Sequence, residues 1–148
     1  MSIHTIQRKL ELATAAYLAA EIASPPSVRT TEDSDAVLER QACIVTAPKA
    51  DGNTDLPACY TCTLTVELRT VIDLYSVRAT AVASHITAWG LIADAMMQDD
   101  LADGIVGAGS DLGINGIENG HSVEYLNTSG VLVNRITRTI FAVAKTLT

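Results

Sequence analysis

The spacing of the hydrophobic positions changes in a regular order along this chain. From about Ser2 to Ile22, hydrophobic residues recur every three or four positions, which predicts an amphipathic helix. From Thr61 to Arg69 the spacing becomes two, which is typical of a strand with one buried and one solvated face. The apolar face of this strand holds Cys62, Leu64, Val66 and Leu68. A second helix is predicted from a stripe through Val82, Ile86, Trp89, Ala93 and Met96.

Three more strand segments complete the predicted order of elements. A short strand is expected at Ala42–Ala47, and the alternating strand extends over about Ala58–Thr70. Two strands, Ile114–Leu126 and Val131–Lys145, end the chain and are joined by a turn at Asn127–Gly130. The order α-β-β-α-β-β predicts one α+β domain over residues 1–148. In this fold two main helices pack on one face of a four-stranded antiparallel or mixed sheet.

Two loops and one glycine interrupt this pattern. Residues 23–41, which include Pro25 and Pro26, are expected to form an acidic loop. After a final helical turn at Asp99–Gly104, residues 104–113 are expected to form a glycine-rich loop. This loop lacks both the third glycine of a dinucleotide-binding fingerprint and the Lys-Ser/Thr of a P-loop. Gly90, inside the second helix, is expected to permit close packing against the sheet or the first helix.

The final strand is apolar on both faces. Ile136, Ile140, Ala142 and Ala144 share one side, and Thr137, Thr139, Phe141 and Val143 share the other. We therefore expect it to be an edge strand that is buried against another subunit.

Charge is distributed unevenly along the sequence. The formal net charge is -7, and residues 79–134 contain no Lys or Arg. All the excess acid lies in that stretch, at Asp94, Asp99, Asp100, Asp103, Asp111, Glu118 and Glu124. Such a region repels nucleic acid phosphates. It is either a soluble acidic face, or a surface past which DNA slides without sticking, or a docking site for a basic partner.

No arrangement of residues in the sequence predicts catalysis or metal binding. Cys59 and Cys62 have C-x-x-C spacing, but residues three apart on a strand point to opposite faces, so structural thiols are expected. His85 is interpreted as a hydrogen-bonded group at the edge of the core. Asp99, Asp100 and Asp103 lack the spacing of an EF-hand. We therefore expect no enzymatic activity, no cofactor and no metal.

The sequence also predicts a protein that is made and kept in a cytoplasm. No hydrophobic run reaches the roughly 18 residues of a membrane span. Met1–His4 is followed by polar residues rather than by the apolar core of a signal peptide.

From Ile3 to Lys145 the chain resembles the tail terminator and related tail-completion (head–tail joining) proteins of tailed bacteriophages. The resemblance lies in four consecutive features: the leading amphipathic helix; the acidic loop at Glu32–Asp35; the strand Tyr60–Arg69, which runs into a helix with His85 and Trp89; and the closing hairpin from Val123-Glu124-Tyr125 to Arg135–Ala144. The family has no catalytic residues.

The resemblance implies a structural virion protein, assembled in the host cytoplasm, that forms a homo-oligomeric ring, typically a hexamer. The ring would cap the tail tube and contact neck or head-completion proteins, and genomic DNA would pass through its channel without sequence-specific binding. Asp94, Asp99, Asp100 and Asp103 are then candidates for the channel surface. Glu32, Asp33 and Asp35 are candidates for a docking loop. Arg135, Arg138 and Phe141 are candidates for the subunit interface, where they would face an acidic region of the next subunit.

Two alternatives remain open from the sequence. The first is another neck, connector or stopper ring of the virion, which would share the fold and differ in its partner. The second is a cytosolic α/β domain that binds a small ligand, which predicts a monomer or dimer with a pocket.

Overall fold

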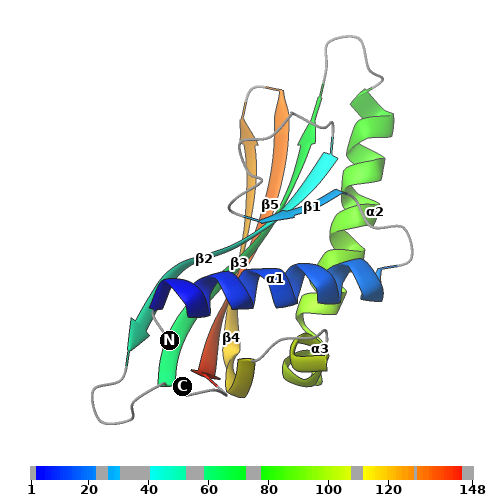
Figure 1. Cartoon of the computed structure of the whole chain (residues 1–148). Coiled ribbons are helices and arrows are strands. Elements are labelled where there is room, and N and C mark those ends of the chain that lie inside the picture. The colour runs from blue at the N-terminus through cyan, green and yellow to red at the C-terminus, as the bar shows by residue number, and fades with distance from the viewer. Residues whose placement is uncertain are drawn as a thin grey trace.

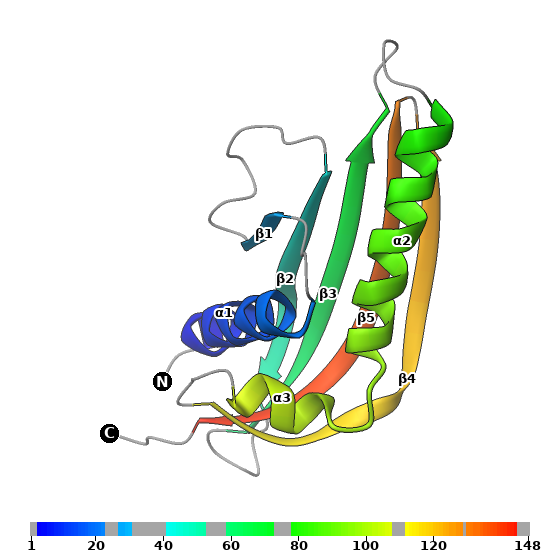
Figure 2. The ribbon, with the colours of Figure 1, turned by 90° about the vertical axis from the view of Figure 1, so that its right-hand side faces the viewer.

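The described residues of the computed structural model are 3–22, 27–30, 41–52, 59–72, 78–107, 112–128 and 130–144. They form a five-stranded sheet with three helices on one face, so the α+β class is confirmed. The first helix, α1 (Ile3–Glu21), crosses the strands, whereas α2 (Arg78–Met96) runs along them (Figures 1 and 2). The short helix α3 (Leu101–Gly107) lies near the end of α2.

The strand order in the sheet is β1-β2-β3-β5-β4. The strands are β1 (Ser27–Thr30), β2 (Gln41–Gly52), β3 (Cys59–Val71), β4 (Leu112–Thr128) and β5 (Val131–Ala144). β1 pairs with β2 in parallel, and the other three pairs are antiparallel, so the sheet is mixed.

The structure corrects the predicted strands in two places. Four strands were expected, but residues 27–30 of the predicted acidic loop form β1, so the described sheet has five. The strand predicted at Ala42–Ala47 continues to Gly52. Its pairing with β3 shifts register between Thr46 and Lys49 and then resumes. Pro48 lies inside this bulge, where its missing N–H costs no ladder bond.

The prediction of a glycine-rich loop at residues 104–113 is wrong at both ends of that segment. Residues 104–107 belong to α3, and Leu112 and Gly113 begin β4. Gly104 occupies the tight contact between α3 and α1, because a Cβ there would lie 2.6 Å from Tyr17 Cε2. Gly90 is exposed, with nothing within 4 Å of the Cβ position, so its predicted packing role is wrong.

The core lies between the helices and the face of the sheet that we call the helix face. As predicted, Cys62, Leu64, Val66 and Leu68 of β3 are fully buried there. The predicted stripe of α2 is wrong at Ile86, which is 64% exposed, whereas His85, Ile92 and Met96 face the core. His85 lies between the Thr70 hydroxyl and the Asn134 amide oxygen, 2.7 Å from each, which satisfies both ring nitrogens.

The last strand is not an edge strand. β5 lies between β3 and β4, so the predicted edge position is wrong. Ile136, Ile140 and Ala142 are buried on the helix face, whereas Phe141 on the other face is 41% exposed. The β4–β5 turn is tied to the end of β3, since Ile72 N donates to Gly130 O at 2.6 Å. Gly130 has a φ of 77°, a conformation that side chains rarely adopt.

Candidate functional site

The face of the sheet opposite the helices is hollowed and polar. We call it the open face, and on β3 it carries Thr61, Thr63, Thr65, Glu67 and Arg69. A depression of about 600 Å³ lies on it, lined by residues of β2, β3, β4 and β5 that include Thr46, Pro48, Thr63, Thr65, Glu67 and Thr137. No helix of the described segments covers this face (Figure 2).

Four charged side chains form a network beside the depression. Arg135 Nη2 and Nε lie 2.6 and 3.1 Å from Glu67 Oε1, and Arg69 Nε lies 2.7 Å from Glu67 Oε2. Arg135 Nη1 also reaches Glu124 Oε2 at 3.3 Å. The hydrogen bonds that Arg135 donates to Glu67 are the main cause that raises the pKa of Arg135. Glu67 is buried by this network, although it lies on the open face.

The network was not predicted from the sequence, in which Glu67 was assigned only to the polar face of its strand. Its cause is the register of the sheet, because both Glu67 and Glu124 are ladder partners of Arg135. The signal that could have found it is the set of opposite charges on the polar positions of strands that were expected to be neighbours.

The predicted interface residues Arg135, Arg138 and Phe141 do not form one patch. Arg135 and Phe141 lie on the open face, and Phe141 is 41% exposed. Arg138 is on the helix face, where it donates from Nη1 to Met96 O at 2.8 Å and from Nη2 to Glu118 O at 3.0 Å. The two arginines therefore cannot act together on one acidic surface.

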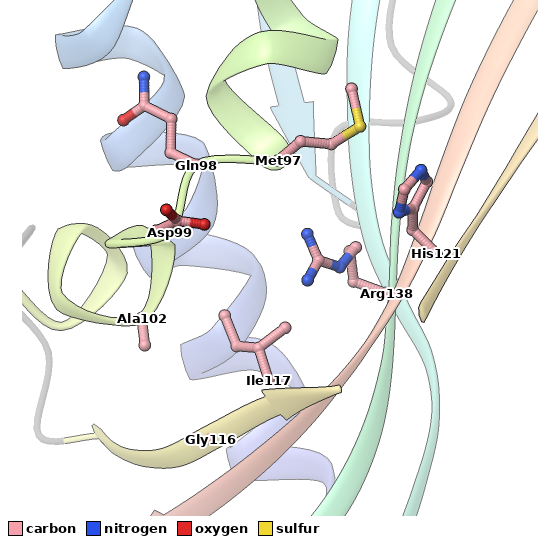
Figure 3. A pocket seen from close by; sticks show the side chains of 8 residues that line it. All are labelled: Met97, Gln98, Asp99, Ala102, Gly116, Ile117, His121 and Arg138. Carbon is pink, nitrogen blue, oxygen red and sulfur yellow. The ribbon is translucent and has the colours of Figure 1, made fainter. Parts of the chain in front are cut away.

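A cavity of about 390 Å³ opens beside Arg138 (Figure 3). The turn after α2 supplies Met97, Gln98 and Asp99, and the opposite walls come from Ala102, Ile117 and His121. β4 changes register between Ile117 and His121 where it passes this cavity. The guanidinium group of Arg138 is directed into the cavity in Figure 3.

The predicted acidic channel residues gather at one corner of the molecule. Asp94, Asp99, Asp100 and Asp103 are all exposed and follow one another through the end of α2, the turn and α3. Gln98 of the same turn donates to Glu21 of α1, which adds another acid to this corner. Burial, with Glu21 and Asp100 nearby, raises the pKa of Tyr17. The docking-loop candidates Glu32, Asp33 and Asp35 lie outside the described residues.

The outer strand β4 exposes apolar side chains for which the sequence predicted no interface. Val123, Tyr125 and Leu126 are 48%, 57% and 40% exposed. β4 has 17 residues and pairs only with β5 among the described strands, so its outer backbone edge has no partner there. Exposed, long and apolar edge strands are where other chains add to a sheet.

The three cysteines are free thiols. Burial raises the pKa of Cys43 to about 12 and that of Cys62 to about 11, and nearby Glu67 and Asp51 add to the respective shifts. Cys59 is only half-buried. We therefore expect iodoacetamide at pH 8 to modify Cys59 alone in the native protein, as read by peptide mass spectrometry. Equal modification of Cys62 would contradict the buried position of that thiol.

The same thiols predict an alkaline loss of stability. Their folded pKa values lie above the ordinary 9.0, so their contribution is complete below about pH 9. As pH rises from 9 towards 11, the unfolded chain forms thiolates first and the free energy of unfolding falls, by at most about 1.4 kcal/mol per pH unit per thiol. We expect Cys43→Ala to flatten this slope in urea unfolding curves, and an unchanged slope would contradict the assignment.

Neither a cluster of metal-binding side chains nor a membrane-spanning helix is found among the described residues. They contain no group of three or more His, Cys, Asp or Glu side chains that could hold a metal ion. Within the same residues, no helix has both the length and the hydrophobicity of a membrane span. In the comparisons with known proteins, no family model matches the chain and no curated protein matches it significantly.

Proposed function

We propose that this protein is a structural subunit that assembles into a ring, and that the ring is the tail terminator of a tailed bacteriophage. The observation that supports assembly is the β4 edge, a strand of 17 residues with Val123, Tyr125 and Leu126 exposed. The choice of a tail terminator rests on the resemblance described above. In this proposal the protein is part of the virion and carries out no catalysis.

The β4 edge replaces the final strand as the proposed subunit interface. Rings require a heterologous contact, in which one patch meets a different patch on the neighbour. The open face of the next copy is a suitable second patch, because it is uncovered by the described helices and Phe141 adds an apolar contact there. Tail-tube and neck proteins would bind the two rims of such a ring.

The acidic corner supports the passage of DNA in this proposal. The corner consists of four exposed side chains, Asp94, Asp99, Asp100 and Asp103. The sequence between residues 94 and 103 contains no Lys or Arg. Carboxylates facing the channel would repel the phosphates of the duplex and keep it from binding to the wall. A neck or stopper ring would use the same surfaces with another partner.

The tail-terminator proposal is tested with tail tubes built from the tube protein of the same genome. Purified protein is mixed with these tubes, and the tube ends are imaged by electron microscopy. A ring on one end of each tube, together with a fixed tube length, is the expected result. Bare tubes would contradict termination, and binding to neck complexes instead would favour the neck alternative.

The β4 interface is tested with Tyr125→Ala, because truncating a central aromatic at an interface costs about 2 kcal/mol, or about 30-fold in affinity. We expect sedimentation to show weaker assembly, alone or on tubes, with unchanged circular dichroism. Ile86→Ala is the matched control, since Ile86 is an equally exposed apolar side chain on α2. An equal loss in both variants would contradict an interface at β4.

A further inference from the structure

The Arg138 cavity contains a cation whose hydrogen-bonding capacity the described residues do not satisfy. Arg138 is 9% exposed. Two backbone carbonyls, those of Met96 and Glu118, accept from Nη1 and Nη2, whereas Nε has no acceptor in the described structure. The ion pairs of the described residues Lys49, Glu67, Arg69, Glu124 and Arg135 do not include Arg138. A guanidinium has five N–H donors, and a buried one without a paired charge is unfavourable.

We propose that this cavity binds a carboxylate carried on a short apolar chain. The planar guanidinium group matches the two oxygens of a carboxylate. The N–H groups of Arg138 that do not donate to Met96 O or Glu118 O can donate to those oxygens. Ile117, Met97 and Ala102 supply apolar wall for the methylene groups that carry the carboxylate (Figure 3). The site uses residues of α3, β4 and β5 and the turn after α2, and it does not depend on the proposed ring.

The charges around the cavity favour a single negative charge over a phosphate. Asp99 lines the wall opposite Arg138, and its carboxylate repels a dianion more strongly than a monoanion. His121 is the other titratable group of the lining, and it is exposed at the edge of the cavity. Because Asp99 repels every anion that Arg138 attracts, a monocarboxylate fits this lining better than a dianion does.

The direct test is a titration with sodium propionate, followed by the Nε–Hε NMR signal of Arg138. Arg138→Lys, which lacks that signal, identifies it in the spectrum. We expect a saturable shift with a Kd on the order of 1–10 mM, as befits a ligand of so few atoms. Propionamide, of the same shape but uncharged, is expected to leave the signal in place. No shift with propionate, or equal shifts with both, would overturn the proposal.

A second test places the carboxylate on the protein itself. Ala102→Glu extends a carboxylate from the cavity wall, and Ala102→Gln is the neutral control of the same size. We expect the Glu variant to have a folding equilibrium constant about tenfold larger than the Gln variant, and to lose the propionate response. Because Glu in the first turn of α3 is favourable in itself, the pair is repeated with Arg138→Met. If the stability difference between the Glu and Gln variants were the same with Arg138→Met, the proposal would be overturned.

The carboxylate could belong to a free small molecule or to a second copy of the chain. Sedimentation of the wild-type protein with and without propionate distinguishes these two sources. A protein that stays monomeric and binds propionate would have a site for a free small carboxylate. Oligomers that dissociate as propionate is added would place the Asp or Glu side chain of a second copy in the cavity. Either result supports the site, and tail-tube capping by the wild-type protein reports separately on the proposed function.

Discussion

We expect Gly104→Ala to lower the free energy of unfolding by about 2 kcal/mol. The added methyl group would lie 2.6 and 2.9 Å from two ring carbons of Tyr17, well inside van der Waals contact. The ring cannot move freely, because Tyr17 is buried and its hydroxyl donates to Ala95 O at 3.0 Å. The steric cost therefore exceeds the gain of up to about 1 kcal/mol that Ala brings to a helix.

The control for this prediction is Gly90→Ala. Gly90 also lies in a helix, but nothing is within 4 Å of its Cβ position. We expect this change to raise the free energy of unfolding by about 0.5–1 kcal/mol, measured by urea unfolding. Tyr17→Leu should partly restore the stability of Gly104→Ala. Equal effects of the two alanines, or strict additivity with Tyr17→Leu, would contradict a contact between Gly104 and Tyr17.

We also expect Glu67→Gln to destabilise the protein by about 2 kcal/mol. Glu67 accepts from two guanidinium groups, at 2.6 Å from Arg135 Nη2 and 2.7 Å from Arg69 Nε. The side chain of Glu67 is only 8% exposed, so water can replace few of the charged hydrogen bonds that are lost when an amide takes the place of the carboxylate. The loss stays below that of a fully buried pair, because the side chains of Arg135 and Arg69 are 34% and 54% exposed.

Glu124→Gln is the matched control for the network. Glu124 lies 3.3 Å from the same Arg135, but its side chain is 55% exposed. We expect a change within about 0.5 kcal/mol in urea unfolding, as for most surface ion pairs. If both variants lost the same stability, the burial of Glu67 would not be the source of its effect.

The elements with a strong local pattern were predictable from the sequence. β3 was recognised because its hydrophobic residues alternate over the whole of Thr61–Arg69, and one-sided burial of a strand requires that alternation. The first helix and the β4–β5 hairpin were found for similar reasons, since spacing and turn residues lie close together in the chain.

What the sequence left open depends on contacts between distant residues. β1 has four residues, too few to show a period, and it exists because it pairs with β2. Hydrophobicity alone assigned Ile86 to the core, but His85 takes that side of α2 because Thr70 and Asn134 bind its ring. The order of the strands in the sheet could not be predicted from the sequence either. In that order β5 lies between β3 and β4, so the last strand is interior.

The candidate site was predicted less well than the fold for the same reason. Arg135 and Arg138 were grouped because both are cations of the final strand, yet residues three apart in a strand lie on opposite faces. The partners of Arg135, Glu67 and Glu124, come from strands on either side of β5. The exposed acids of the α2–α3 corner follow one another in the chain, so their grouping does not depend on the pairing of distant strands.

The two edges of the sheet are unlike, and this limits how copies can add to one another. At one edge β1 covers residues 42–45 of β2, and Gln7 of α1 donates to Ala47 O at 2.7 Å. At the other edge, β4 presents an unpaired backbone along the described strand. Fibre growth by strand addition needs two edges that accept one another repeatedly. Pairing of β4 with the β4 of a second copy ends at two copies, whereas the proposed contact of β4 with the open face of the next copy can continue around a closed ring.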